Sequence, residues 1–121
     1  MQKNKKSILI VDDDIVLSRT IQLLLEEYGH VVSCCHNSFD AITLSMQSPF
    51  DLILIDYNMP ELKGDLVCEF IREYQPDGYI VGLSSEFKKK AFLNAGANKF
   101  IHKGDLIDNI TFLNQLIQQA S

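Results

Sequence analysis

Carboxylates gather at the ends of two short apolar runs. Asp12, Asp13 and Asp14 come directly after one run of four apolar residues, and Asp56 follows another. If these runs form neighbouring strands of a parallel sheet, the carboxylates lie close together. Crowded carboxylates repel one another, and a divalent cation relieves that repulsion. Because Mg²⁺ prefers a few carboxylates with backbone oxygens, water and phosphate, the pattern predicts a site for Mg²⁺ (or Mn²⁺).

A lysine and a hydroxyl stand at the ends of two further apolar runs. Lys103 follows residues 99–102, and Ser84 follows residues 79–83. An ammonium and a hydroxyl can both contact the oxygens of a phosphoryl group. Either residue alone is a weak signal. Together with Asp56 as the acceptor and a metal beside it, they indicate phosphoryl transfer.

Five apolar runs alternate along the chain with five amphipathic segments. The continuous, branched apolar runs are typical of strands that are buried on both faces. Asn37 or Ser38 can cap the second helix, which Pro49 ends, and Asp13 or Asp14 can cap the first. The remaining expected strands and helices are residues 7–11, 15–28, 31–35, 52–55, 66–71, 79–83, 87–94, 99–102 and 106–118.

Strict alternation of strands and helices predicts a parallel sheet with right-handed crossovers and helices on both faces. The fold class is therefore α/β, a flavodoxin-like (βα)5 three-layer sandwich with strand order 2-1-3-4-5. In such sheets the functional site lies beyond the carboxyl ends of the strands, near the switch point between strands 1 and 3. The four aspartates stand at that point.

Length and composition describe one globular domain over residues 1–121, with a flexible basic N-terminus at residues 1–6. The net charge of −5 argues against direct nucleic-acid binding. No apolar run is long enough to span a bilayer, and the N-terminus is not a signal peptide, so no membrane contact is expected. The sequence also lacks a P-loop, a G-x-G-x-x-G motif and an H-E-x-x-H motif.

Three cysteines, two of them adjacent, do not form a disulfide framework and favour a reducing cytoplasm. His30, Cys34, Cys35 and His36 lie close in sequence, but their spacing matches no common zinc pattern. We therefore expect these residues to be structural.

Three segments resemble the receiver domains of bacterial two-component response regulators. Residues 8–14 (ILIVDDD) resemble the first strand with its acidic pair. Residues 56–64 (DYNMPELKG) resemble the phosphorylation loop, and residues 95–103 (AGANKFIHK) resemble the approach to the family's lysine. The resemblance extends from about residue 7 through the last helix.

The resemblance implies a phosphorylation site and a metal site. Asp56 would accept a phosphoryl group from a sensor histidine kinase or a histidine phosphotransfer protein. Asp13 and Asp56 would bind Mg²⁺ together with the backbone carbonyl of Asn58, and Asp12 would act directly or through water. The domain would catalyse only its own phosphorylation and dephosphorylation, and so would not be an enzyme with a separate substrate.

The resemblance also implies a switch. Lys103 would hold the phosphoryl group, the Ser84 hydroxyl would swing inward on phosphorylation, and Phe100 would follow that motion. A downstream protein target or a separate output domain would then respond. Polar residues at Asn58 and Glu86 imply self-dephosphorylation that is not unusually slow.

Two features depart from the family. Gly104 stands where proline usually follows the lysine, so we expect a trans peptide there or a looser lysine loop. The segment from Ser84 to Gly96 is about three residues shorter than usual, so the helix within it should be short or the loop before it tight. Lys88, Lys89 and Lys90 lie there and are interpreted mainly as a solvated face.

Two alternatives remain open from the sequence. Residues 8–14 also fit the start of haloacid-dehalogenase-like phosphohydrolases, in which Asp12 would be the nucleophile. A degenerate receiver that signals without phosphate is the other, since the lysine loop is altered. Intact Asp13, Asp56 and Lys103 argue against the degenerate form.

Overall fold

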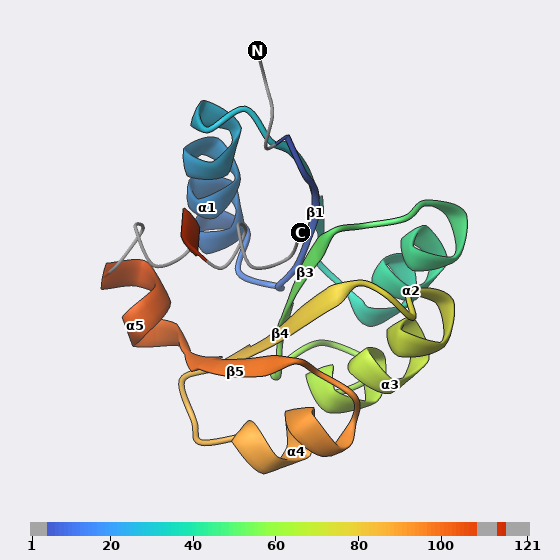
Figure 1. The fold of residues 1–121 in the computed structure, drawn as a ribbon. Helices are drawn as coiled ribbons and strands as arrows, with labels where there is room; N and C mark the ends of the chain where they lie inside the picture. The colour runs from blue at the N-terminus through green and yellow to red at the C-terminus, as the bar shows by residue number, and fades with distance from the viewer. Residues whose placement is uncertain (1–4, 109–113, 116–121) are drawn as a thin grey trace.

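A computed structural model describes residues 5–108 and 114–115 of the chain. Strands and helices alternate through the described part, as expected (Figure 1). Their bounds are β1 (Ser7–Val11), α1 (Ile15–Glu27), β2 (Val31–Cys35), α2 (Ser38–Gln47), β3 (Leu52–Asp56), α3 (Gly64–Tyr74), β4 (Tyr79–Ser84), α4 (Lys89–Asn94), β5 (Lys99–His102) and α5 (Lys103–Asp108).

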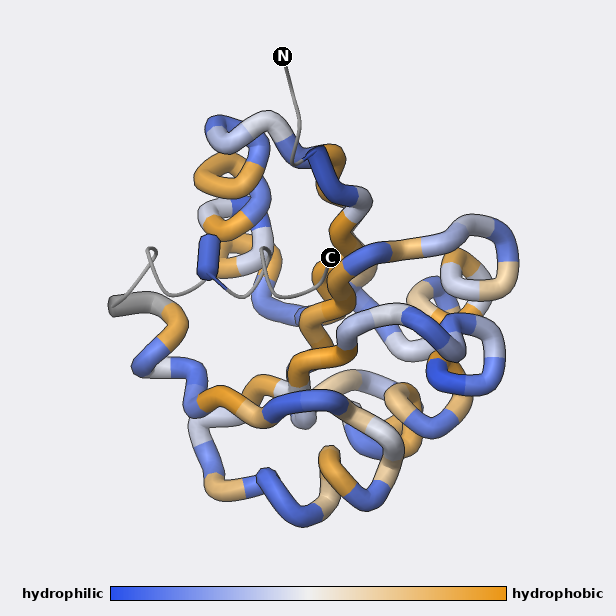
Figure 2. The backbone as a smooth tube through the Cα atoms, in the orientation of Figure 1, coloured by the Kyte–Doolittle hydropathy of each residue, from blue (hydrophilic) through white to orange (hydrophobic). Residues whose placement is uncertain are grey.

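The five strands form one parallel sheet in the order β2-β1-β3-β4-β5, which confirms the predicted fold class. The helices α1 and α5 lie on one side of the sheet, and α2, α3 and α4 lie on the other (Figure 1). Successive strand residues alternate between the two cores: Leu9 and Ile53 pack toward α2, α3 and α4, whereas Ile8 and Leu52 pack toward α1. This is why the three central strands, β1, β3 and β4, are mostly apolar, as the central tube in Figure 2 shows.

Polar side chains cap the first two helices as the sequence predicts. The carboxylate of Asp14 accepts a hydrogen bond from the backbone N–H of Leu17 at 3.0 Å, and the amide oxygen of Asn37 accepts one from that of Asp40 at 2.9 Å. Gly29 ends the first helix with a φ of 92°, a left-handed conformation that glycine adopts without steric cost. The bounds of α1 are therefore set locally, by Asp14 at its start and Gly29 after its end.

The region from β4 onward differs in detail from the expected boundaries. α4 has six residues, which confirms that this helix is short. α5 begins at Lys103, three residues earlier than expected, and residues 109–113 and 116–118 of the predicted last helix lie outside the described part. Gly104 keeps a backbone N–H that proline lacks, and it donates to Nδ1 of His102 at 3.1 Å, which caps the first turn. The peptide bonds here are trans, as expected.

None of the helices described is both long enough and apolar enough to cross a membrane.

Candidate functional site

Three carboxylates converge where β1 and β3 end. Val11 is paired with Ile55 in the sheet, so the residues that follow, Asp12 and Asp56, leave adjacent strands at the same edge. Carboxylate oxygens of Asp12, Asp13 and Asp56 all lie within 4.8 Å of one another. Asp12 and Asp56 are buried, whereas Asp13 is exposed. The predicted acidic cluster is therefore present in the structure.

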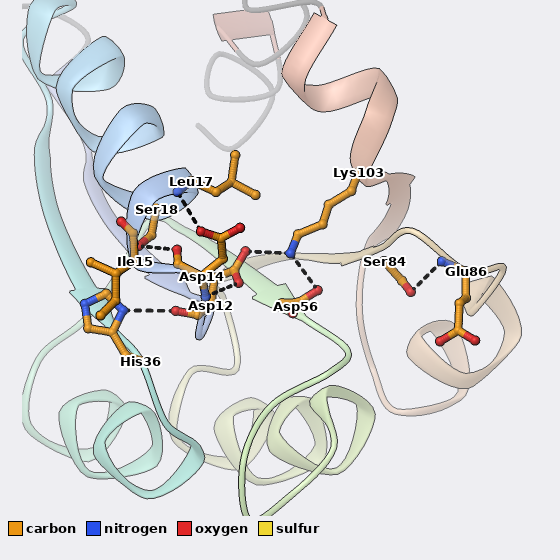
Figure 3. Close-up of polar contacts among 10 residues, drawn as sticks. All are labelled: Asp12, Asp14, Ile15, Leu17, Ser18, His36, Asp56, Ser84, Glu86 and Lys103. Atoms are coloured by element: carbon orange, nitrogen blue, oxygen red, sulfur yellow. Dashed lines mark hydrogen bonds and ion pairs between the residues drawn. The ribbon is translucent and has the colours of Figure 1, made fainter.

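The ammonium of Lys103 lies between two of these carboxylates. Its Nζ is 2.9 Å from Oδ2 of Asp12 and 3.2 Å from Oδ1 of Asp56 (Figure 3). Lys103 is the first residue of α5, directly after β5, and its long side chain reaches across the end of β4 toward β3. One positive charge thus stands among three acidic groups, which leaves the site acidic overall.

Burial and the acidic neighbours change the titration of the site. Burial raises the pKa of Asp56, the charge of Asp12 raises it further, and Lys103 opposes both, so the pKa is about 6. Burial disfavours the ammonium of Lys103. The hydrogen bond with Asp12 and the charges of Asp12 and Asp56 outweigh that effect, so the pKa of Lys103 is raised above its usual value. The raised pKa of Asp56 shows that its ionised form is disfavoured by burial and by repulsion from Asp12, and a bound cation would relieve that repulsion.

The donor atoms fit a hard divalent cation. All three acidic side chains offer oxygens, and Oδ2 of Asp12 is a buried atom whose partner among the described residues is the ammonium of Lys103, at 2.9 Å. Oxygen-only sites suit Mg²⁺, Ca²⁺ or Mn²⁺. The histidine and cysteine cluster does not form a comparable site, because His30 and His36 flank opposite ends of β2.

The loop after Asp56 folds back against that residue. The N–H of Gly64 donates to the carbonyl of Tyr57 at 2.7 Å. A Cβ atom on Gly64 would overlap the backbone carbonyl of Asp56 and lie 2.7 Å from Cα of Tyr57. Only glycine fits this close approach, so Gly64 sets the path of the loop that contains Asn58, whose side chain is exposed.

Ser84 and Phe100, the two predicted switch residues, have partners outside the acidic cluster. Ser84 is the last residue of β4 and fully buried, and its hydroxyl accepts a hydrogen bond from the N–H of Glu86 at 2.9 Å (Figure 3). Phe100 stacks on Phe92 with ring centroids 6.1 Å apart. The structure therefore brings Asp12, Asp13, Asp56 and Lys103 together, and it leaves Ser84 turned toward Glu86.

Aromatic rings connect the site to α4. Tyr57, next to Asp56, meets the buried ring of Phe92 edge-on at 6.2 Å, and Phe92 stacks on Phe100. Phe100 also meets Phe87, which is 83% exposed. Lys88 lies with Nζ 4.6 Å from the centroid of the Tyr57 ring, so one lysine of the basic run contacts the loop after Asp56 rather than only solvent.

Sequence reasoning missed one group beside the site. Nδ1 of His36 lies 3.0 Å from the backbone carbonyl of Asp12 (Figure 3). The two residues are 24 positions apart, so no local pattern connects them. The signal that could have found this contact is the register of the sheet, because both residues follow the ends of adjacent strands.

Comparisons with known proteins agree with this geometry. Residues 8–112 match the family model of the response regulator receiver domain. The two-component response regulator ARR22 of Arabidopsis thaliana is 33% identical over 109 residues, which cover 85% of this chain and 77% of that protein. The transcriptional regulatory protein ResD of Bacillus subtilis is 31% identical over 104 residues, which cover 84% of the chain but 43% of ResD. The chain thus spans less than half of ResD.

Solved structures show the same fold. A two-component response regulator from Clostridium difficile superposes with a TM-score of 0.85 at 23% identity, covering 95% of this chain and 97% of that one. The receiver domain of the sensor histidine kinase PA1611 from Pseudomonas aeruginosa, with magnesium coordinated in its active-site cleft, has a TM-score of 0.83 at 24% identity. That match covers 95% and 96% of the two chains.

The phosphohydrolase alternative finds no support in these comparisons. The family model covers most of the chain, including all of the acidic residues discussed. The chain therefore belongs to the family of receiver domains of two-component response regulators.

Proposed function

We propose that this receiver domain accepts a phosphoryl group on Asp56 from the phosphohistidine of a sensor histidine kinase or a histidine phosphotransfer protein. The observation that carries the proposal is the convergence of Asp12, Asp13 and Asp56 within 4.8 Å, with Lys103 3.2 Å from the acceptor carboxylate. A stretch of the signal transduction histidine-protein kinase BarA of Escherichia coli is 29% identical over 102 residues, which is consistent with a role in histidine-kinase signalling.

The transfer would exchange one bond to phosphorus for another. A carboxylate oxygen of Asp56 attacks the phosphorus, the bond between phosphorus and the histidine nitrogen breaks, and the departing imidazole takes up a proton. Above pH about 6 the carboxylate of Asp56 is ionised and can act as the nucleophile. Lys103 then stands where its charge can balance the incoming phosphoryl oxygens.

Asp12, Asp13, Asp56 and the backbone carbonyl of Asn58 would hold Mg²⁺ (or Mn²⁺). When bound, the cation supplies positive charge to the phosphoryl oxygens and relieves the repulsion among the carboxylates. Two relatives of known structure support the proposal: the PA1611 receiver domain, which holds magnesium in its cleft, and a Burkholderia pseudomallei response regulator with a phosphorylated aspartic acid and a calcium ion.

Phosphorylation would be read through Ser84 and Phe100. The Ser84 hydroxyl, now on the N–H of Glu86, would turn to the phosphoryl group, and Phe100 would move within its stack on Phe92. The exposed ring of Phe87 would carry that change to the surface. A charge added at Asp56 would in this way change the surface around Phe87, where a downstream protein or a separate output domain can bind.

Labelling with acetyl phosphate and Mg²⁺, followed by intact and peptide mass spectrometry, tests the proposal. Wild type should gain the mass of one phosphoryl group on the peptide that contains Asp56, and Asp56→Asn should not. Asp51→Asn is the matched control, because Asp51 lies just before the opposite end of the same strand.

Label on Asp12 or turnover of free phosphomonoesters would refute the assignment. A folded wild type that gains no label with acetyl phosphate, and binds no beryllofluoride, would favour the degenerate receiver instead. A cytoplasmic location and a single domain over residues 1–121 stay predictions.

A further inference from the structure

Residues 36–38 form the turn from β2 into the start of α2. This turn contacts the two segments that carry the acidic site, the Asp12–Asp13 peptide and the loop after Asp56. We propose that this turn is a positioning element that holds the Asp12–Asp13 peptide and the loop after Asp56 in the arrangement that binds metal. The inference rests on the proposed metal-dependent function. The sheet order explains its reach, because β1 lies between β2 and β3, and the turn at the end of β2 meets the segments that follow both of those strands.

His36 contacts the first of these segments, the Asp12–Asp13 peptide. A carbonyl oxygen can only accept, so Nδ1 of His36 carries the hydrogen that it donates to the carbonyl of Asp12 at 3.0 Å. The N–H of Asp12 in turn donates to the carbonyl of Cys35 at 3.0 Å. The residue is thus fixed on both of its backbone sides by the end of β2. Its carbonyl belongs to the peptide unit that carries Asp13, so His36 orients the backbone of both acidic residues.

This contact does not depend on the charge of the imidazole. The neutral ring with hydrogen on Nδ1 and the doubly protonated ring both donate from that atom. His36 is half-buried at the end of β2, where Nδ1 of its ring faces the carbonyl of Asp12 (Figure 3). A side chain without a donor at this position would leave the carbonyl of Asp12 free to rotate toward the cluster of carboxylates.

Ser38 contacts the second segment, the loop after Asp56. Its side chain is fully buried, and Oγ lies 2.5 Å from the carbonyl of Pro60 and 2.7 Å from that of Leu62. The N–H of Leu62 also donates to Oγ at 3.1 Å. The backbone N–H of Ser38 donates to the carboxylate of Glu61 at 3.2 Å. One serine therefore contacts three successive residues of the loop that follows Asp56.

The loop needs such an anchor. Glu61 has a φ of 67°, a left-handed conformation that glutamate does not favour by itself. Its carboxylate at the start of α2 and the hydroxyl of Ser38 compensate for that conformation. Asn58, whose carbonyl is the proposed fourth ligand, lies in the same loop. The turn thus joins the two segments whose spacing decides whether a small, demanding cation fits.

Metal affinity measured without phosphorylation tests the inference. Mn²⁺ is titrated into the full chain, the loss of the free-ion electron paramagnetic resonance signal is followed, and Mg²⁺ competition gives its affinity. Removing an outer hydrogen-bond partner of a metal ligand usually weakens metal binding about 10- to 100-fold. We expect a loss of about tenfold or more for His36→Leu and for Ser38→Ala. His36→Asn keeps a donor near the position of Nδ1 and should bind within about threefold of wild type.

Matched controls separate positioning from general stability. His30→Leu removes a buried histidine at the other end of β2, and Ser45→Ala removes a buried hydroxyl at the other end of α2. Both controls should keep wild-type metal affinity, and urea denaturation reports whether each variant is folded. If Ser38→Ala does not fold, the comparison of His36→Leu with His36→Asn decides alone.

Three results would overturn the inference. Wild-type affinity in His36→Leu and Ser38→Ala would refute it while leaving the metal site intact. Equal losses in His36→Asn and His36→Leu would show that the donor is not responsible. Equal losses in the controls would show that the effect is one of stability. A wild type that binds neither cation would refute the proposed function itself, which distinguishes that failure from the others.

Discussion

Replacing Lys103 with methionine removes the cation from the acidic cluster while keeping a side chain of similar length. The carboxylates of Asp12 and Asp56, 1% and 5% exposed, would then lie beside Asp13 with no positive neighbour from this side chain. Removing one partner of a buried ion pair typically destabilises a protein by about 3–5 kcal/mol. Because Asp56 can bind a proton and relieve part of the repulsion, we expect the lower value, about 3 kcal/mol at pH 8.

The loss in the free energy of unfolding caused by Lys103→Met should increase as the pH rises. The pKa of Asp56 is already about 6, above its ordinary value of 3.8, and without Lys103 it rises further. A carboxyl with a raised folded-state pKa stabilises the fold below its ordinary pKa, and that stabilisation is lost as pH rises through the folded-state value. The difference between wild type and Lys103→Met should therefore be small near pH 5 and grow from pH 6 to 8.

Urea denaturation followed by far-ultraviolet circular dichroism at pH 5, 6, 7 and 8 measures this difference. Lys90→Met, which changes an exposed lysine of α4, is the control and should stay close to wild type. Added Mg²⁺ should narrow the gap, because the cation replaces the missing charge. Equal stability of Lys103→Met and Lys90→Met at pH 8, or a gap that does not change with pH, would refute the electrostatic reasoning.

Three other predictions follow from the structure. Mg²⁺ binding should weaken below pH about 6, by about tenfold per pH unit, because Asp56 must lose its proton to bind metal; a flat calorimetric affinity from pH 5 to 7 would contradict this. Gly64→Ala should cost about 2 kcal/mol or more and reduce labelling with acetyl phosphate, since the new Cβ displaces the backbone of Asp56. Gly104→Ala, with its closest contact at 3.2 Å on a side chain, is the milder comparison in urea denaturation. Arg72→Met should reduce the free energy of unfolding by about 2–3 kcal/mol, because its guanidinium donates to backbone carbonyls of two segments, residues 75–78 and Gly96, at 2.7–3.3 Å. The control variant Arg19→Met, at an exposed arginine, should keep wild-type stability. Equal urea midpoints for Arg72→Met and Arg19→Met would count against a structural role for Arg72.

The sequence by itself determined the sheet and the location of the acidic site. Strands buried on both faces must be apolar at every position, so each run of branched residues marks a strand without any tertiary information. The carboxyl ends of parallel strands meet at one edge, so Asp12, Asp56 and Lys103 could be placed together before their distances were known. Helix caps at Asp14 and Asn37 were equally local and were confirmed.

Only the tertiary structure decided how those groups are held. The early start of α5 depends on the ring of His102, which donates from Nε2 to Ser85 across the sheet at 2.9 Å while Nδ1 caps the helix. The pairing of Lys103 with Asp12 as well as Asp56 depends on where a long side chain ends.

The contacts of the 36–38 turn are of the same kind. His36 and Ser38 reach residues 22 to 24 positions away, and no periodicity in the sequence records such contacts. Periodicity reports which face of an element is buried, because burial repeats with the geometry of the strand or helix. It does not report which polar atoms meet once the elements pack, because those partners come from different elements and are set by register and side-chain length.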